Sequence, residues 1–156
     1  MATTLKDRIQ ADLTEAIRAQ DTTTVSTLRL VLTAITKAET AGDTHAALDD
    51  DQVIGVIGTE VKRRVEAATT YADAGRTDRA DAERAEQVVL ERYLPAALSD
   101  DELATVVAEE VATAKAAGQE GKAATGVVIK AVRARAGAGT DGRRIAEAVN
   151  AALAAG

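Results

Sequence analysis

Apolar residues recur every three or four positions along most of the chain, which is the spacing of one face of an α-helix. The first such segment, residues 4–19, carries an apolar residue at every fourth position: Leu5, Ile9, Leu13 and Ile17. The polar run at residues 21–24 supplies a helix cap. A second helix, with Val25, Leu28, Leu32 and Ile35 on one face, follows it and ends near residue 41, before Gly42.

A third helix is predicted over residues 49–74, because Asp49 is followed three residues later by Gln52, a pair that caps backbone N–H groups. Its apolar face is predicted to comprise Ile54, Ile57, Val61, Val65 and Ala68. Gly55 and Gly58 each destabilise a helix interior by roughly 1 kcal/mol relative to alanine. We therefore expect another helix to approach closely there. A fourth helix, residues 78–93, is mostly charged and is expected to face solvent.

Pro95 marks a boundary, because the residue before a proline is disfavoured in a helix. Ser99 and Glu102 then form a capping box, which starts a helix over residues 99–117. Two shorter helices are predicted at residues 122–136 and 142–155. No segment alternates with a period of two, so the sequence predicts an all-α protein. We expect an N-terminal domain of about four helices (residues 1–94) and a small three-helix domain (residues 99–156).

The composition agrees with a helical protein. The 156 residues include no Cys, Phe or Trp, and the only aromatic residues are Tyr71 and Tyr93, so Leu, Ile, Val and Ala must fill the core. The absence of cysteine excludes disulfides, thiolate metal sites and cysteine nucleophiles. The N-terminal residues have no apolar segment typical of a secretion signal, and no stretch reaches the roughly 20 apolar residues of a membrane span. We expect a cytoplasmic protein without membrane contact.

Charge is distributed unevenly along the chain. The formal net charge is −6, which argues against nucleic-acid binding by the whole surface. Residues 122–147 nevertheless carry a local net charge of +4. The charged residues of this segment are Lys122, Lys130, Arg133, Arg135, Asp141, Arg143, Arg144 and Glu147. The segment is therefore the candidate contact surface for an anionic partner.

Residues 137–142 read Gly-Ala-Gly-Thr-Asp-Gly, which matches the glycine spacing of dinucleotide-binding loops. Those loops follow a β-strand, whereas a helix precedes this one. We interpret the segment as a turn in which Gly137 ends one helix at positive φ and Asp141 caps the next. Gly139, Asp141 and Gly142 still mark a candidate phosphate-binding turn, because free N–H groups point out of the start of a helix.

Four cations accompany this turn: Lys130, Arg133, Arg143 and Arg144. Two interpretations remain open for them, contact with phosphate groups or an ordinary solvated surface. Without aromatic side chains nearby there is no platform for stacking single-stranded bases, so a folded nucleic acid is the better candidate ligand. No nucleophile with a neighbouring base, metal-ligand motif or phosphate-binding lysine motif is present, so we assign no catalytic residue, metal or cofactor.

Three segments carry a family resemblance: Thr27-Leu-Arg-Leu-Val-Leu-Thr-Ala-Ile35, Tyr93-Leu-Pro-Ala-Ala-Leu-Ser99-Asp-Asp-Glu-Leu103, and Gly126-Val-Val-Ile-Lys130 followed by Gly139-Thr-Asp-Gly142. Together they resemble the GatB/YqeY family over nearly the whole chain. The resemblance implies an extra N-terminal helical domain before a domain similar to the tail of the B subunit of tRNA-dependent amidotransferases. In those enzymes the tail contacts transfer RNA, while the ATP and glutamine chemistry occurs elsewhere.

These observations predict a non-catalytic, tRNA-associated binding module that uses Lys130, Arg133, Arg143 and Arg144. The alternative is a protein–protein adaptor that docks on an amidotransferase or another enzyme. The resemblance also carries the family's label of carbon–nitrogen ligase activity with glutamine as amido-nitrogen donor. The chain lacks residues for that reaction, so we expect no such activity from the chain alone. The sequence does not determine the oligomeric state.

Overall fold

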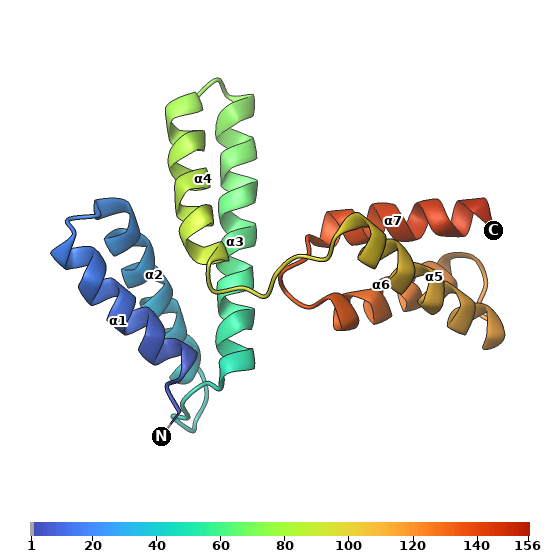
Figure 1. The fold of residues 1–156 in the computed structure, drawn as a ribbon, viewed down its shortest axis with the longest axis horizontal. Helices are drawn as coiled ribbons and strands as arrows, with labels where there is room; N and C mark the ends of the chain where they lie inside the picture. The colour runs from blue at the N-terminus through green and yellow to red at the C-terminus, as the bar shows by residue number, and fades with distance from the viewer. Residues whose placement is uncertain (1) are drawn as a thin grey trace. The chain divides into compact units, whose positions relative to one another are not determined.

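The computed structural model describes residues 2–156, and every regular element in this part of the chain is an α-helix. This confirms the all-α prediction, and the seven helices begin and end within two residues of the predicted positions. The chain divides into two compact units, Met1–Leu94 and Pro95–Gly156 (Figure 1). None of the described helices is long and apolar enough to cross a membrane.

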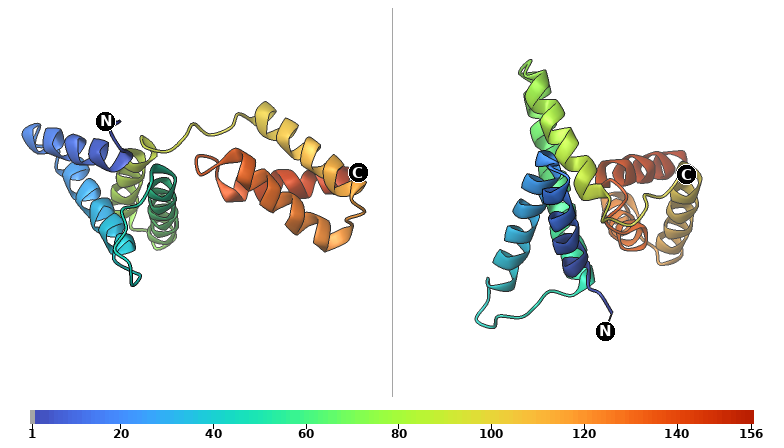
Figure 2. Two further views of the ribbon diagram at one scale, coloured as in Figure 1. Left: turned by 90° about the horizontal axis from the view of Figure 1, so that it is seen from below. Right: turned by 60° about the vertical axis from the view of Figure 1, so that its left-hand side comes forward.

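The first unit consists of two helical hairpins (Figures 1 and 2). Helices α1 (Leu5–Arg18) and α2 (Thr22–Glu39) form one hairpin, and α3 (Asp50–Asp73) and α4 (Thr77–Glu91) form the other. The core between them contains apolar side chains from all four helices and from Tyr93, which follows α4. Its buried members are Ile9, Leu28, Val31, Ile35, Val53, Ile57, Val89, Leu90 and Tyr93.

The predicted apolar face of α1 is wrong at its last position. Ile9 is fully buried, but Ile17 is 49% exposed and Ala16 is buried instead. An α-helix turns by about 100° per residue, so each step of four residues advances the face by about 40°. Ile17 is two such steps beyond Ile9, whereas Ala16, seven residues after Ile9, returns to nearly the same direction. The four-residue pattern therefore drifts away from the core.

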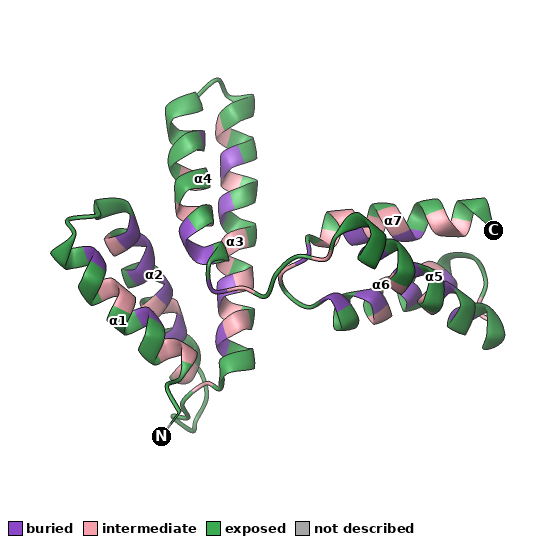
Figure 3. Ribbon diagram, viewed as in Figure 1, coloured by how far each residue is buried: buried purple, intermediate pink, exposed green. Residues whose placement is uncertain are grey.

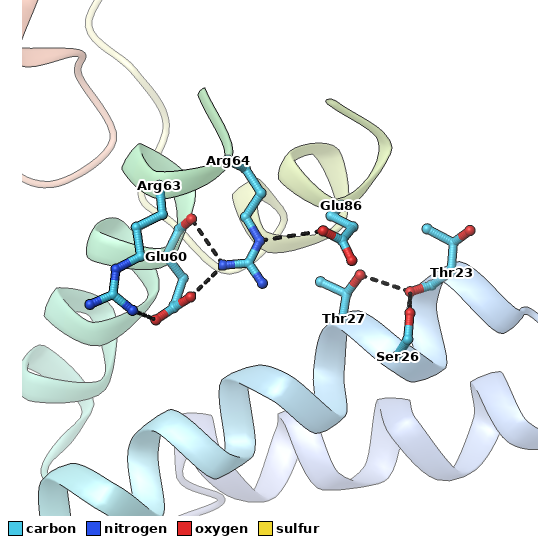
Figure 4. A network of polar contacts seen from close by, with 7 residues as sticks. All are labelled: Thr23, Ser26, Thr27, Glu60, Arg63, Arg64 and Glu86. Carbon is cyan, nitrogen blue, oxygen red and sulfur yellow. Dashed lines mark hydrogen bonds and ion pairs between the residues drawn. The ribbon is translucent and has the colours of Figure 1, made fainter. Parts of the chain in front are cut away.

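The predicted apolar face of α3 is wrong at Val65 for the same reason. Val65 is 40% exposed, and Arg64 is buried in its place. Arg64 forms an ion pair between helices. Its guanidinium pairs with Glu60 on α3 and, at 3.6 Å, with Glu86 on α4 (Figure 4). The expected close helix approach at Gly55 is wrong, because a Cβ atom there would meet no atom within 4 Å.

The second unit is a three-helix domain formed by α5 (Asp100–Ala116), α6 (Gly121–Ala136) and α7 (Gly142–Ala155). The inward faces of its helices are buried and the outward faces exposed (Figure 3). The buried core consists of aliphatic side chains from all three helices: Leu103, Val107, Val111, Ala114, Val128, Val132, Ala136, Ile145 and Val149. No aromatic residue lies in this unit.

Three predicted helix starts are confirmed by their hydrogen bonds. Asp21 caps α2, and capping boxes begin α3 (Asp49 with Gln52) and α5 (Ser99 with Glu102). Each cap satisfies backbone N–H groups that have no partner within the helix. These local contacts explain why the helix boundaries could be placed from the sequence.

Candidate nucleic-acid interface

The turn between α6 and α7 has the geometry predicted for a helix–helix connection. Gly137 ends α6 with φ of 72°, a left-handed conformation that glycine adopts without strain. Asp141 is the N-cap of α7, and its side chain accepts a hydrogen bond of 2.9 Å from the N–H of Arg143. No β-strand occurs in residues 2–156, so the glycine pattern does not form a dinucleotide-binding loop.

The inner side of this turn packs against residues 95–98 of the same unit. A Cβ atom on Gly139 would lie 1.9 Å from the carbonyl oxygen of Pro95, so only glycine permits this approach. The next residue, Thr140, is buried, and its hydroxyl accepts a hydrogen bond of 3.0 Å from the N–H of Leu98. Gly139 therefore serves the packing of the turn and is not free to contact a ligand with its inner face.

Arg144 extends the same contact. Its Nη2 atom donates hydrogen bonds to the carbonyl oxygen of Leu98 (2.8 Å) and to the carboxylate of Asp100 (2.9 Å). Asp100 is the first residue of α5, so Arg144 connects the start of α7 to the start of α5. We name the contacts of Gly139, Thr140 and Arg144 with residues 95–100 the turn clasp. The guanidinium of Arg144 is thus already used within the unit.

Arg135 is also paired internally. Its guanidinium contacts Glu109 at 2.7 Å and Glu110 at 3.2 Å, both on α5. The hydrogen bonds to these two carboxylates raise the pKa of Arg135 above its ordinary value. Two of the six cations in the basic segment therefore stabilise helix packing and contribute little net positive charge to the surface.

The other cations of the segment remain accessible. Lys130, Arg133 and Arg143 are exposed and form no ion pair within residues 2–156, and the same holds for Lys122. The guanidinium of Arg133 lies against Gly142, where a Cβ atom would be only 2.9 Å from its Nη2 atom. The structure therefore brings Arg133 to the first residue of α7, directly before Arg143.

Lys122 belongs to the same surface although the sequence-based set omitted it. Lys122, Lys130 and Arg133 are spaced by eight and three residues, and at about 100° per residue they lie within a sector of about 80° on α6. This spacing could have been recognised in the sequence, because all three residues lie in the helix that begins at Gly121. We name Lys122, Lys130, Arg133 and Arg143 the cationic face.

The cationic face is suited to binding anions. A cation near a helix N-terminus is unfavourable with respect to the helix dipole, and the Asp141 carboxylate offsets this only in part. A phosphate group beside Gly142 would pair with Arg133 and Arg143, whereas the N–H of Arg143 is already bonded to the Asp141 carboxylate. These groups offer positive charge and hydrogen-bond donors for binding, and we assign none of them a catalytic role.

The fold and this surface define a class: an all-helical protein of two compact units with a cationic face on the second. A family model described as Yqey-like protein matches residues 6–153 of the 156-residue chain. The chain therefore belongs to the YqeY-like protein family. This confirms the family resemblance inferred from the three sequence segments. A comparison with curated proteins finds no match.

Proposed function

We propose that this protein is a non-catalytic binding module for transfer RNA and that the cationic face is its RNA contact. The observation that carries the proposal is the concentration of four exposed, unpaired cations on α6 and the start of α7, in a chain whose net charge is −6. Cations without internal partners can contact phosphates without first breaking an ion pair of the fold, and each contact releases counterions from the nucleic acid.

The resemblance to the tail of the amidotransferase B subunit supports transfer RNA as the ligand, because that tail contacts the body of transfer RNA. We assign Lys130, Arg133 and Arg143 to the contact and add Lys122. Arg144 receives a supporting role instead, because its guanidinium is held by Leu98 and Asp100. In this proposal the chain brings RNA to a partner enzyme or holds it there, and ligase chemistry belongs to the partner.

The test measures binding of bulk transfer RNA to the full chain by fluorescence anisotropy at low salt. A triple variant, Lys130→Ala, Arg133→Ala and Arg143→Ala, is expected to lose most of the affinity. A matched control replaces three cations of the first unit with alanine: Arg29, Lys37 and Lys62, which are exposed and form no ion pair with any residue that the structure describes.

Both triple variants lower the net charge by the same amount, so a general charge effect would weaken both equally. The proposal predicts loss only in the variant of the cationic face. Equal affinity of the two variants, or no binding of transfer RNA by the natural chain, would refute it.

The alternative function is a protein–protein adaptor, and two features favour it. Leu30 on α2 and Val88 on α4 are 52% and 56% exposed. A groove of about 440 Å³ between α5 and α7 is lined by Leu103, Val107 and four alanines, together with the charged residues Asp100, Arg144 and Glu147. Recovery of partner proteins in a native pull-down separates the two functions: ribonuclease treatment abolishes it if RNA is the link and leaves it intact for an adaptor.

A further inference from the structure

Helix α6 differs in charge from the other six helices. Its sequence, residues 121–136, contains four basic residues and no Asp or Glu, whereas every other helix of the chain includes at least one acidic residue. Arg135 points to α5 and is neutralised there. The exposed side of α6 is consequently a purely cationic row of Lys122, Lys130 and Arg133, with no carboxylate on the same helix to repel a phosphate.

A glycine interrupts this row in its middle. Gly126 lies four residues after Lys122 and four before Lys130, so it falls in the same sector of the helix. It is exposed, its φ is not positive, and a Cβ atom there would meet no atom within 4 Å. The fold therefore gives no reason for glycine at this position, although glycine is a poorer helix former than almost any other residue.

We infer that Gly126 is the point at which the backbone of double-helical RNA comes closest to α6. The inference rests on the proposed RNA-binding function and specifies how that same surface is used. Without a side chain at residue 126, a sugar–phosphate strand can lie against the helix backbone while Lys122 and Lys130 contact phosphates on either side. A larger side chain holds the strand away from both lysines.

The chemistry of the second unit favours a duplex as the ligand. Single-stranded RNA is bound mainly by stacking its bases on aromatic rings, and both tyrosines of the chain, Tyr71 and Tyr93, lie in the first unit. An A-form RNA duplex presents a wide, shallow minor groove that proteins recognise by shape and by contacts to phosphates and 2′-hydroxyl groups. From Lys122 to Arg133 the cationic row extends about 16 Å along the helix, which is long enough to contact several phosphates.

The experiment compares the affinities of the full chain and two variants for three probes: an RNA hairpin duplex, a single-stranded RNA of the same length and a DNA duplex of the same sequence. The test variant is Gly126→Leu. Its matched control is Gly55→Leu, because Gly55 is also exposed in a helix and would also meet no atom within 4 Å. Leucine is the better helix former, so both variants should melt at or above the temperature of the natural chain.

The inference predicts that the natural chain binds the RNA duplex more tightly than either other probe. It predicts that Gly126→Leu lowers the duplex affinity by about tenfold while Gly55→Leu leaves it unchanged, because only residue 126 separates the phosphates from the flanking lysines. If RNA binds but Gly126→Leu has no effect, or if single-stranded RNA binds as tightly as the duplex, this inference is wrong and the proposed function stands. If no RNA binds, both fail.

Discussion

Replacing Gly139 with alanine would place a methyl group 1.9 Å from the carbonyl oxygen of Pro95. A backbone atom cannot move aside as the end of a flexible side chain can, so residues 95–98 must shift. That shift lengthens the hydrogen bond from the N–H of Leu98 to the hydroxyl of Thr140, which is now 3.0 Å. Overpacking typically costs about 1–3 kcal/mol, and a partly buried donor left without a partner costs up to about as much again.

We therefore expect Gly139→Ala to lower the free energy of unfolding of the second unit by about 2–4 kcal/mol. Folded domains of this size have a stability of roughly 3–9 kcal/mol, so the loss is a large fraction of the total. The matched control is Gly126→Ala in the same unit, where the new methyl group meets no atom within 4 Å. That substitution should raise stability by about 0.5–1 kcal/mol, because alanine is the better helix former.

The two units can be followed separately in one denaturant titration. Both tyrosines lie in the first unit, so tyrosine fluorescence reports only on that unit, whereas circular dichroism reports the helices of both. Gly139→Ala should move part of the circular dichroism transition to lower denaturant and leave the tyrosine transition in place. An unchanged circular dichroism transition would refute the assigned role of the turn clasp, and so would a shift confined to the tyrosine signal.

Three further substitutions test other contacts. Arg64→Met should lower the stability of the first unit by about 2–4 kcal/mol, measured by tyrosine fluorescence, because it removes the ion-pair partner of the largely buried Glu86 and leaves Glu60 paired only with Arg63. Burial, followed by the 2.6 Å hydrogen bond to Asp12, raises the pKa of Tyr93, so the folded state favours the neutral phenol. The stability that Tyr93 gains from this shift is fully present below the unfolded pKa of about 10 and is lost as the pH rises toward the higher folded pKa. Tyr93→Phe should therefore reduce the loss of stability at alkaline pH. Hydrogen bonds with Ser99 lower the pKa of Glu102. The stability that Glu102 gains from this shift is present above the unfolded pKa of about 4.3 and is lost as the pH falls through the lower folded pKa. Denaturation of Glu102→Gln across the acid range should therefore show a weaker pH dependence than the natural chain.

The helices could be predicted from the sequence because their boundaries depend on local chemistry. The capping pair of Ser99 and Glu102 places the start of α5 without reference to the rest of the fold. The buried face of each helix was predicted less well. A step of four residues advances around the helix by about 40°, so a strict four-residue pattern leaves the core within a few turns, as it does at Ile17.

Arg64 illustrates a second limit of the sequence. An arginine at a core position is assigned to the surface by any rule based on polarity. It is buried here because Glu60 and Glu86 surround its guanidinium, and Glu86 comes from another helix. That partner becomes visible only when α3 and α4 are packed together.

The same limit applies to the candidate site. The basic segment of residues 122–147 was evident from the sequence, and four of its six cations were selected as candidate contacts, but the sequence did not show which cations are paired within the fold. Helix packing separates them, because Arg135 pairs with acids on α5 and Arg144 bonds to Leu98 and Asp100. Lys122 could have been included from helical spacing alone.

The salt dependence of transfer RNA binding tests the central claim most directly. If all four cations of the cationic face contact phosphates, the logarithm of the association constant should fall against the logarithm of salt concentration with a slope of about −3 to −4. Replacing Lys130, Arg133 and Arg143 with alanine should reduce this slope to about −1. The control variant at Arg29, Lys37 and Lys62 should keep the slope of the natural chain. A slope that is the same in both variants would contradict the assignment of the cationic face as the RNA contact.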